Sequence, residues 1–152
     1  MNQYELAIQD YDKAIKLNPS NFAMYANRGN AYCYLEQYER AIEDFDKAIE
    51  LSPDNFVIYA NRGGSYISLK QYEKAIDDCN KAIKFNPNFT EAYYNRGLAY
   101  VGLEKYKLAI QDFNKAVELN PYNYLVYIYR SNAYKKLSEA DLEIAKQLGY
   151  EG

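Results

Sequence analysis

The chain has 152 residues, of which 49% are hydrophobic and 26% are charged, a balance typical of folded globular proteins. Its formal net charge is −3 at pH 7, so the sequence lacks the strongly basic surface that nucleic-acid binding requires. No apolar run approaches the roughly 18 residues of a membrane-spanning helix, and no basic stretch followed by an apolar one opens the chain. We therefore expect a cytoplasmic protein with neither a nucleic-acid nor a membrane partner.

The first predicted helix covers residues 1–17. Its apolar residues recur at spacings of three and four, which is the helical pattern: Tyr4, Ala7, Ile8, Tyr11, Ala14 and Ile15. Pro19 ends this helix, because proline has no amide hydrogen and disfavours helical geometry in the residue before it. Asn21 is a predicted N-cap for the helix that follows.

The same alternation of helix and turn continues to the end of the chain. The further predicted helices are 22–35, 38–51, 56–69, 72–85, 90–103, 106–119, 124–137 and a shorter last helix over 139–148. The turns between them are short, which favours antiparallel neighbours. The sequence therefore predicts an all-α fold of nine helices.

A fixed period organises these helices. The four prolines, Pro19, Pro53, Pro87 and Pro121, are separated by 34 residues each time. A period of this size is the signature of a stacked-repeat architecture, in which neighbouring repeats build one continuous core. We expect a single array: 1–21 as the second half of a repeat, 22–55, 56–89 and 90–123 as full repeats, and 124–152 as a shortened last repeat with a capping helix.

Small residues mark close contacts within each repeat. Glycine recurs in the first helix and alanine at the start of the second: Gly29, Gly63 and Gly97, then Ala41, Ala75 and Ala109. A second series of alanines, Ala48, Ala82 and Ala116, is expected to make a close contact with the next repeat. A glycine inside a helix costs about 1 kcal/mol relative to alanine. The recurrence of glycine at this place therefore predicts that two helix backbones approach closely at it, with large aromatic residues packed around the contact.

With these residues in place, the chain resembles the tetratricopeptide repeat family. The resemblance rests on a series of large, small and proline residues in each repeat: Tyr25, Gly29, Tyr32, Ala41, Phe45, Ala48 and Pro53; Tyr59, Gly63, Tyr66, Ala75, Cys79, Ala82 and Pro87; and Tyr93, Gly97, Tyr100, Ala109, Phe113, Ala116 and Pro121. It implies a right-handed superhelical solenoid of antiparallel helix pairs. It also implies that the first helix of each repeat lines a concave groove.

One place departs from the family pattern, which often has leucine there. This chain has arginine instead, at Arg28, Arg62, Arg96 and Arg130. A buried charge without a partner is costly, so these arginines need carboxylates. Aspartates recur with the same period at Asp10, Asp44, Asp78 and Asp112. We predict a ladder of Arg–Asp contacts between paired helices; the alternative is that the arginines bind an acidic ligand.

By the same resemblance, the groove is expected to bind a peptide or protein segment. The candidate groove residues are Asn27, Asn30, Tyr34, Asn61, Tyr94, Asn95, Leu98, Ile128, Tyr129, Asn132 and Lys135. Asn27, Asn61 and Asn95 occupy one place in successive repeats, and a carboxamide can both donate to and accept from the backbone of an extended peptide. The alternatives are that these asparagines satisfy only local groups, and that Tyr94, Leu98 and Ile128 pack between repeats.

Family members that capture the acidic C-terminal tails of chaperones use lysines and an arginine at the second, fifth and sixth places of the repeats that line the groove. Here those places hold Ala26, Asn61, Glu91 and Asn95, of which only the two asparagines fit the pattern. The resemblance therefore predicts no carboxylate clamp. We expect the groove to prefer an apolar or mixed segment.

Nothing in the sequence indicates catalysis, a metal site or a cofactor. There is no histidine, no Gly-rich phosphate loop and no GxSxG motif. The two cysteines, Cys33 and Cys79, lie at different places in their repeats, which disfavours a disulfide or metal site. Cys79 stands where Phe45 and Phe113 stand in other repeats, so we expect a small buried apolar side chain. The chain is predicted not to be an enzyme.

The beginning of the chain suggests a second candidate function. Residues 1–17 form the second half of a repeat without its first helix, which suggests that the chain is part of a longer array or that this helix meets a partner. A rival to groove binding is therefore an assembly element that forms a homodimer through residues 1–17. A third alternative is a regulatory fragment of a longer protein.

Overall fold

The computed structural model describes the backbone of residues 3–147 and the side chains of residues 3–140. This part of the chain is all-α, with no strand. Its helices are α1 (Gln3–Leu17), α2 (Phe22–Tyr34), α3 (Tyr38–Leu51), α4 (Phe56–Ser68), α5 (Tyr72–Phe85), α6 (Thr90–Gly102), α7 (Tyr106–Leu119) and α8 (Tyr124–Gln147). The expected helices up to residue 119 are confirmed to within two residues at each end, except that residues 1 and 2 of the first one lie outside the described part.

The end of the array differs from the prediction. We expected a break after residue 137 and a separate capping helix over 139–148, but the backbone continues as one helix to Gln147. The repeat pattern explains the difference, because Glu143 and Gln147 stand 34 residues after Ala109 and Phe113. A second helix with these residues would lack the small and aromatic groups that pack it against the first. Residue 148 and the side chains from residue 141 onward lie outside the described part.

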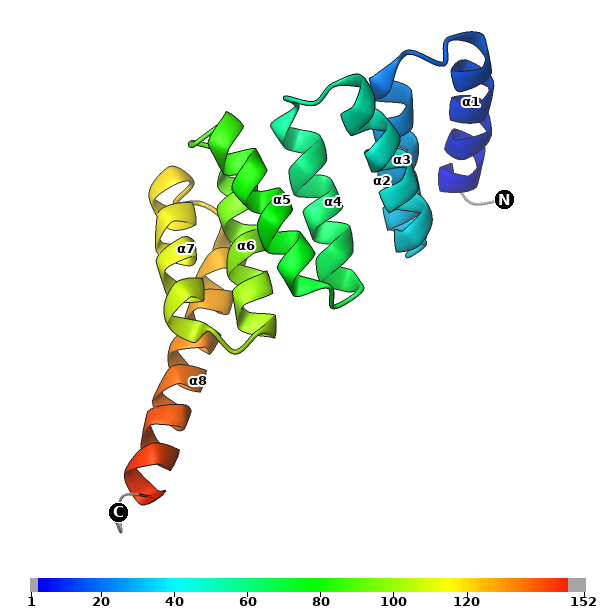
Figure 1. Cartoon of the computed structure of the whole chain (residues 1–152). Coiled ribbons are helices and arrows are strands. Elements are labelled where there is room, and N and C mark those ends of the chain that lie inside the picture. Colours follow the sequence, from blue (N-terminus) through cyan, green and yellow to red (C-terminus); the bar gives the residue numbers. More distant parts are fainter. Residues whose placement is uncertain (1–2, 148–152) are drawn as a thin grey trace.

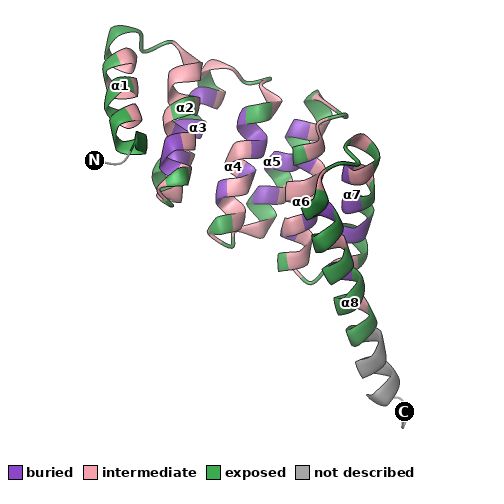
Figure 2. Ribbon diagram, turned by 180° about the vertical axis from the view of Figure 1, so that it is seen from behind, coloured by how far each residue is buried: buried purple, intermediate pink, exposed green. Residues whose placement is uncertain are grey.

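The helices form an elongated stack of antiparallel pairs, an all-α repeat solenoid. The most extensive contacts lie within the pairs α2–α3, α4–α5 and α6–α7, and the next most extensive join successive pairs. Figure 1 shows the pairs following one another, with the two ends of the chain at opposite ends of the stack. Buried residues lie along the helix faces that meet inside this stack (Figure 2).

Recurring turn chemistry connects the helices. Asn21 and Asn55 cap α2 and α4 by accepting hydrogen bonds from Ala23 N and Val57 N, as predicted for Asn21. The first-helix tyrosines donate from their hydroxyls to the proline carbonyls of the preceding turn, for example Tyr59 to Pro53 at 3.0 Å. The same bond recurs from Tyr25 to Pro19, from Tyr93 to Pro87 and from Tyr127 to Pro121.

Within each pair, the two helices approach most closely at the periodic small residues. The alanines at both second-helix places are fully buried in α3, α5 and α7. A Cβ on Gly29 would lie 2.8 Å from the Phe45 ring, and one on Gly97 would lie 2.6 Å from the Phe113 ring. At Gly63 the nearest atom is the smaller Cys79 Sγ at 3.2 Å, and Cys79 is fully buried as expected.

The predicted Arg–Asp ladder is present between paired helices in the three full repeats. Arg28, Arg62 and Arg96 each donate from Nε and Nη2 to both oxygens of one aspartate, at 2.6–2.7 Å. The partners are Asp44, Asp78 and Asp112, all buried. The hydrogen bonds to Asp44 raise the pKa of the Arg28 guanidinium, so this arginine stays charged. Asp10 instead pairs with Lys13 at the exposed surface of α1.

A second set of acceptors, which sequence reasoning missed, joins successive repeats. Nη1 of each arginine donates to a residue sixteen positions earlier, on the preceding second helix: Arg28 to Asp12, Arg62 to Asp46, Arg96 to Asn80 and Arg130 to Asn114. Each of the first three arginines thus bridges three helices. The acceptors recur every 34 residues, and this spacing was visible in the sequence. Their residue type changes from aspartate to asparagine along the chain, which hides the series.

Replacing one member of a buried pair should destabilise the fold more than replacing both. Asp78→Leu leaves Arg62, whose side chain is 14% exposed, without its bidentate partner, and is expected to cost about 3 kcal/mol. The double variant Arg62→Leu/Asp78→Leu should be more stable than Asp78→Leu alone. Urea unfolding followed by circular dichroism measures both; additive losses in the double variant would contradict the coupling.

The glycine contacts predict a matched pair of substitutions. Gly97→Ala forces the Phe113 ring to move, and overpacking of this kind costs about 1–3 kcal/mol. The Cβ of Gly63→Ala would lie 3.2 Å from Cys79 Sγ and 3.4 Å from the Ala75 carbonyl oxygen, so the helix propensity of alanine, worth about 1 kcal/mol, offsets much of the strain. Thermal unfolding should therefore show a larger fall in Tm for Gly97→Ala than for Gly63→Ala, and an equal fall would contradict this packing.

Candidate functional site

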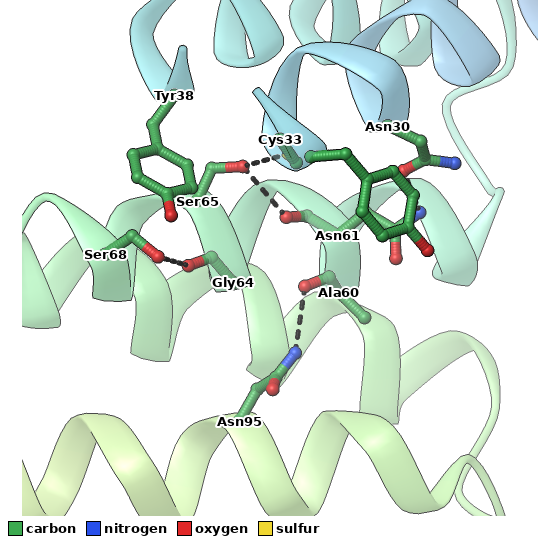
Figure 3. Close-up of a pocket in the computed structure, with 10 residues that line it drawn as sticks. Asn30, Cys33, Tyr38, Ala60, Asn61, Gly64, Ser65, Ser68 and Asn95 are labelled. Carbon is green, nitrogen blue, oxygen red and sulfur yellow. Dashed lines mark hydrogen bonds between the residues drawn. The ribbon is translucent and has the colours of Figure 1, made fainter. Parts of the chain in front are cut away.

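The first helices of the repeats present two hollows along one side of the stack. The central hollow has a volume of about 440 Å³ and lies between α2, α4 and α6 (Figure 3). Its lining residues are Asn30, Cys33, Tyr34, Tyr38, Ala60, Asn61, Gly64, Ser65, Ser68 and Asn95. The structure thus brings together four of the predicted groove residues, namely Asn30, Tyr34, Asn61 and Asn95.

The asparagines of the central hollow connect successive first helices. Asn61 Nδ2 donates to Asn30 Oδ1 at 3.0 Å, and Asn95 Nδ2 donates to the Ala60 carbonyl at 3.1 Å. These are the local bonds that the alternative interpretation expected. A carboxamide has a second N–H and an oxygen with two lone pairs, so each side chain keeps capacity for a ligand. Asn27, the first member of this series, is exposed on α2.

Ser65 and Cys33 form a second polar pair in the hollow. The Ser65 hydroxyl donates to the Asn61 carbonyl at 3.3 Å, and its oxygen also lies within hydrogen-bond distance of Cys33 Sγ, at 3.2 Å. Burial raises the pKa of the Cys33 thiol, against the smaller opposing effect of the Ser65 hydrogen bond. Sequence reasoning missed Ser65 and Tyr38. The available signal was that Ser65 interrupts a series of alanines, Ala31, Ala99 and Ala133.

Two predicted groove residues are part of the packing between repeats. Tyr94 and Leu98 are partly buried against the core cluster that contains Ala109, Phe113 and Val126. The Tyr94 ring lies edge-on to Tyr129, with centroids 5.7 Å apart. Burial, with a smaller contribution from Tyr129, raises the pKa of Tyr94 to about 12. These two side chains therefore support the groove wall more than they project from it.

The end hollow lies beside α8 and has a volume of about 360 Å³. Its lining residues are Val101, Tyr129, Asn132, Ala133, Lys135, Lys136 and Glu139, which include three predicted groove residues. Lys136 pairs with Glu139 at 2.9 Å, and Lys135 lies 4.0 Å from the same carboxylate. The positive charge at this end of the groove is therefore partly neutralised. Ile128, also predicted, is exposed on α8.

The two hollows offer hydrogen bonding and apolar contact. The central hollow carries amides, hydroxyls and a thiol, with no charged side chain among its lining residues.

Within the described residues, no group of three His, Cys, Asp or Glu side chains could hold a metal ion. No helix of that part of the chain has the length and apolar character needed to cross a membrane.

Comparison with known sequences identifies the family. The profile described as "Tetratricopeptide repeat" matches residues 23–55, 56–89 and 90–123. The chain belongs to the tetratricopeptide repeat family. A second profile of the family, "TPR repeat", matches residues 1–33 and so extends the match over α1. The comparison with curated protein sequences yields no match.

Solved tetratricopeptide repeat structures are similar to this chain over most of its length. The first TPR of Spaghetti (RPAP3) bound to the HSP90 peptide SRMEEVD is 31% identical, covers 77% of this chain and 93% of its own, and gives a TM-score of 0.75. The second TPR domain of human RPAP3 in complex with the HSP70 peptide SGPTIEEVD is 32% identical, with coverages of 75% and 98% and a TM-score of 0.69. The crystal structure of MamA is 25% identical, with coverages of 97% and 92% and a TM-score of 0.76.

The two cysteines should differ in reactivity, because Cys33 lies in the central hollow and Cys79 lies in the core. Cys33 is half-buried in the hollow, whereas Cys79 is fully buried and its thiol pKa is raised to about 12, chiefly by burial. We expect iodoacetamide at pH 8 to modify Cys33 slowly in the native chain and Cys79 only after denaturation. Peptide mass mapping measures both sites, and native modification of Cys79 at the rate of Cys33 would contradict this geometry.

Proposed function

We propose that this chain is a protein–protein interaction module that holds a segment of a partner protein along the central and end hollows. The observation that carries the proposal is the central hollow, in which asparagine amides from α2, α4 and α6 converge (Figure 3). Their local bonds fix the orientation of the side chains. Their remaining donors and acceptors suit the backbone of an extended peptide, with each bond worth about 0.5–1.5 kcal/mol net.

The preferred ligand is a segment without a cluster of acidic residues. Two of the structural relatives named above, both RPAP3 domains, were solved with peptides that end in EEVD. In this chain the places expected to carry a carboxylate clamp hold Ala26, Asn61, Glu91 and Asn95. Glu91 is exposed and adds negative charge, so it opposes an acidic tail. The partner segment is therefore apolar or mixed in character.

A peptide array followed by fluorescence anisotropy tests this proposal. We expect selected binders to be poor in Asp and Glu, and the peptide SGPTIEEVD to bind at least tenfold more weakly than they do. Asn61→Ala and Asn95→Ala should each weaken binding about fivefold or more, which corresponds to roughly 1 kcal/mol.

Asn88→Ala is a matched control, because Asn88 is exposed in the turn before α6. This variant should bind like the unmodified chain. Equal loss in the control, or binders dominated by acidic C-termini, would overturn the proposal.

The second candidate function, self-association through residues 1–17, is supported by the exposure of α1. This helix contains no buried residue, although it carries alanines and an aromatic residue at the places that are buried in α3. A homodimer through α1 predicts a mass that depends on protein concentration and falls when this helix is altered. Light scattering against concentration measures this mass; a constant monomer mass would rule the dimer out.

The expectations on enzymatic activity, cofactors, other partners and location agree with a binding module. We propose no enzymatic activity, cofactor, nucleic-acid partner or membrane partner for this chain, since its repeating architecture offers interaction surfaces and its central hollow offers hydrogen-bonding groups. The cytoplasmic location expected from the sequence stays a prediction.

A further inference from the structure

The helices at the two ends of the array are complementary halves of a repeat. By the 34-residue period, α1 is a second helix, with Ala7, Tyr11 and Ala14 at the places of Ala41, Phe45 and Ala48. The first turns of α8, residues 124–137, are a first helix whose own second helix does not fold back onto it. Among the described residues, α1 is therefore a second helix without a paired first helix, and residues 124–137 are a first helix without a paired second helix.

The side chains of α1 are more exposed than those at the same places in α3. Ala41, Phe45 and Ala48 in α3 are 0% exposed, whereas α1 has no buried residue. Asp10 stands at the place of Asp44, and its side chain is 76% exposed against 7% for Asp44. Asp12, two residues further, already pairs with Arg28 of the same chain. Asp10 thus lies on the open side of α1, away from the rest of the array.

The matching face of α8 is exposed in the same way. Tyr134 is 51% exposed, whereas Tyr32, at the same place in the first full repeat, is 5% exposed under α3. Arg130 donates from Nη1 to Asn114, as Arg96 does to Asn80. Arg96 also holds Asp112 through Nε and Nη2, but the structure pairs Arg130 with no carboxylate among the described side chains. The place that would supply this carboxylate is lysine, Lys146.

We propose that α1 of a second copy of this chain packs on residues 124–137 of α8 and completes the last repeat between the two molecules. In this arrangement the partner's Asp10 accepts the Nε and Nη2 hydrogen bonds of Arg130, as Asp112 accepts those of Arg96. The interface joins the head of one copy to the tail of the next, so both ends of each molecule remain able to bind further copies. It leaves the groove of each copy free and therefore goes beyond the proposed peptide binding.

The course of α8 and the side chain of Ser131 determine how closely the two copies can pack at this interface. The far end of α8 runs away from the stack (Figure 1), and Tyr134 on the face of residues 124–137 is 51% exposed. Ser131 stands at the place of Gly97, where even a Cβ would lie 2.6 Å from the Phe113 ring. The Tyr11 ring of the second copy must therefore lie somewhat further from α8 than Phe113 lies from α6. This makes the contact weaker than the contacts within the chain, so assembly depends on protein concentration.

Charge reversal tests the proposal by sedimentation velocity and light scattering over a range of concentrations. The unmodified chain should form species that grow beyond a dimer. Arg130→Glu and Asp10→Arg should each be monomeric, because they place like charges across the contact. An equimolar mixture of the two variants should assemble again. In that mixture the two substituted side chains attract each other, and the unmodified Arg130 of one variant faces the unmodified Asp10 of the other.

Control variants separate a specific contact from a change in net charge. Glu43→Arg and Lys84→Glu carry the same charge changes at exposed places on α3 and α5. They should assemble like the unmodified chain, and circular dichroism should show the same helix content for all variants. A monomeric unmodified chain, undiminished assembly of Arg130→Glu, or a monomeric mixture would each overturn the proposal. Failure of peptide binding in the groove would leave these results unchanged.

Discussion

One interaction, the arginine bridge, positions each helix pair on the one before it. Arg62 on α4 holds both oxygens of Asp78 on α5 and reaches back with its third nitrogen to Asp46 on α3. A planar guanidinium has donors on three sides, so a single residue fixes the angle between paired helices and the stagger between successive repeats. The close packing at the periodic glycines and alanines then fills the space that the bridge defines.

The groove depends on the same geometry. Because the bridges hold α2, α4 and α6 in a regular stagger, Asn61 can bond with Asn30, and Asn95 can reach the backbone of α4. These bonds place uncharged polar groups around a hollow of about 440 Å³ that no charged side chain lines. The arrangement separates the ionic groups that hold the array together from the polar groups that can meet a ligand.

The period of the sequence predicted most of this structure, because stacked repeats place the same residue types in the same surroundings. Arg28 and Asp44 were predictable partners for that reason. Ser65 and the continuation of α8 were not predicted, since each depends on a departure from the pattern. Because no second helix packs against it, α8 continues past the place where the inner repeats turn. In the inner repeats this turn holds Glu36, Lys70 and Glu104 at a φ of 58°. Such a backbone costs about 1–2 kcal/mol and requires packing of the next helix.

Amide hydrogen exchange at several protein concentrations measures how firmly each bridged helix is held. We expect strong protection from α3 to α7 and weak protection in α1 and in residues 124–137 of α8 when the chain is dilute. As the concentration rises, protection should increase in α1 and α8 together. Equal protection of all helices in dilute solution would contradict the stabilisation by the arginine bridges, and a rise confined to one end would contradict the contact between α1 and α8.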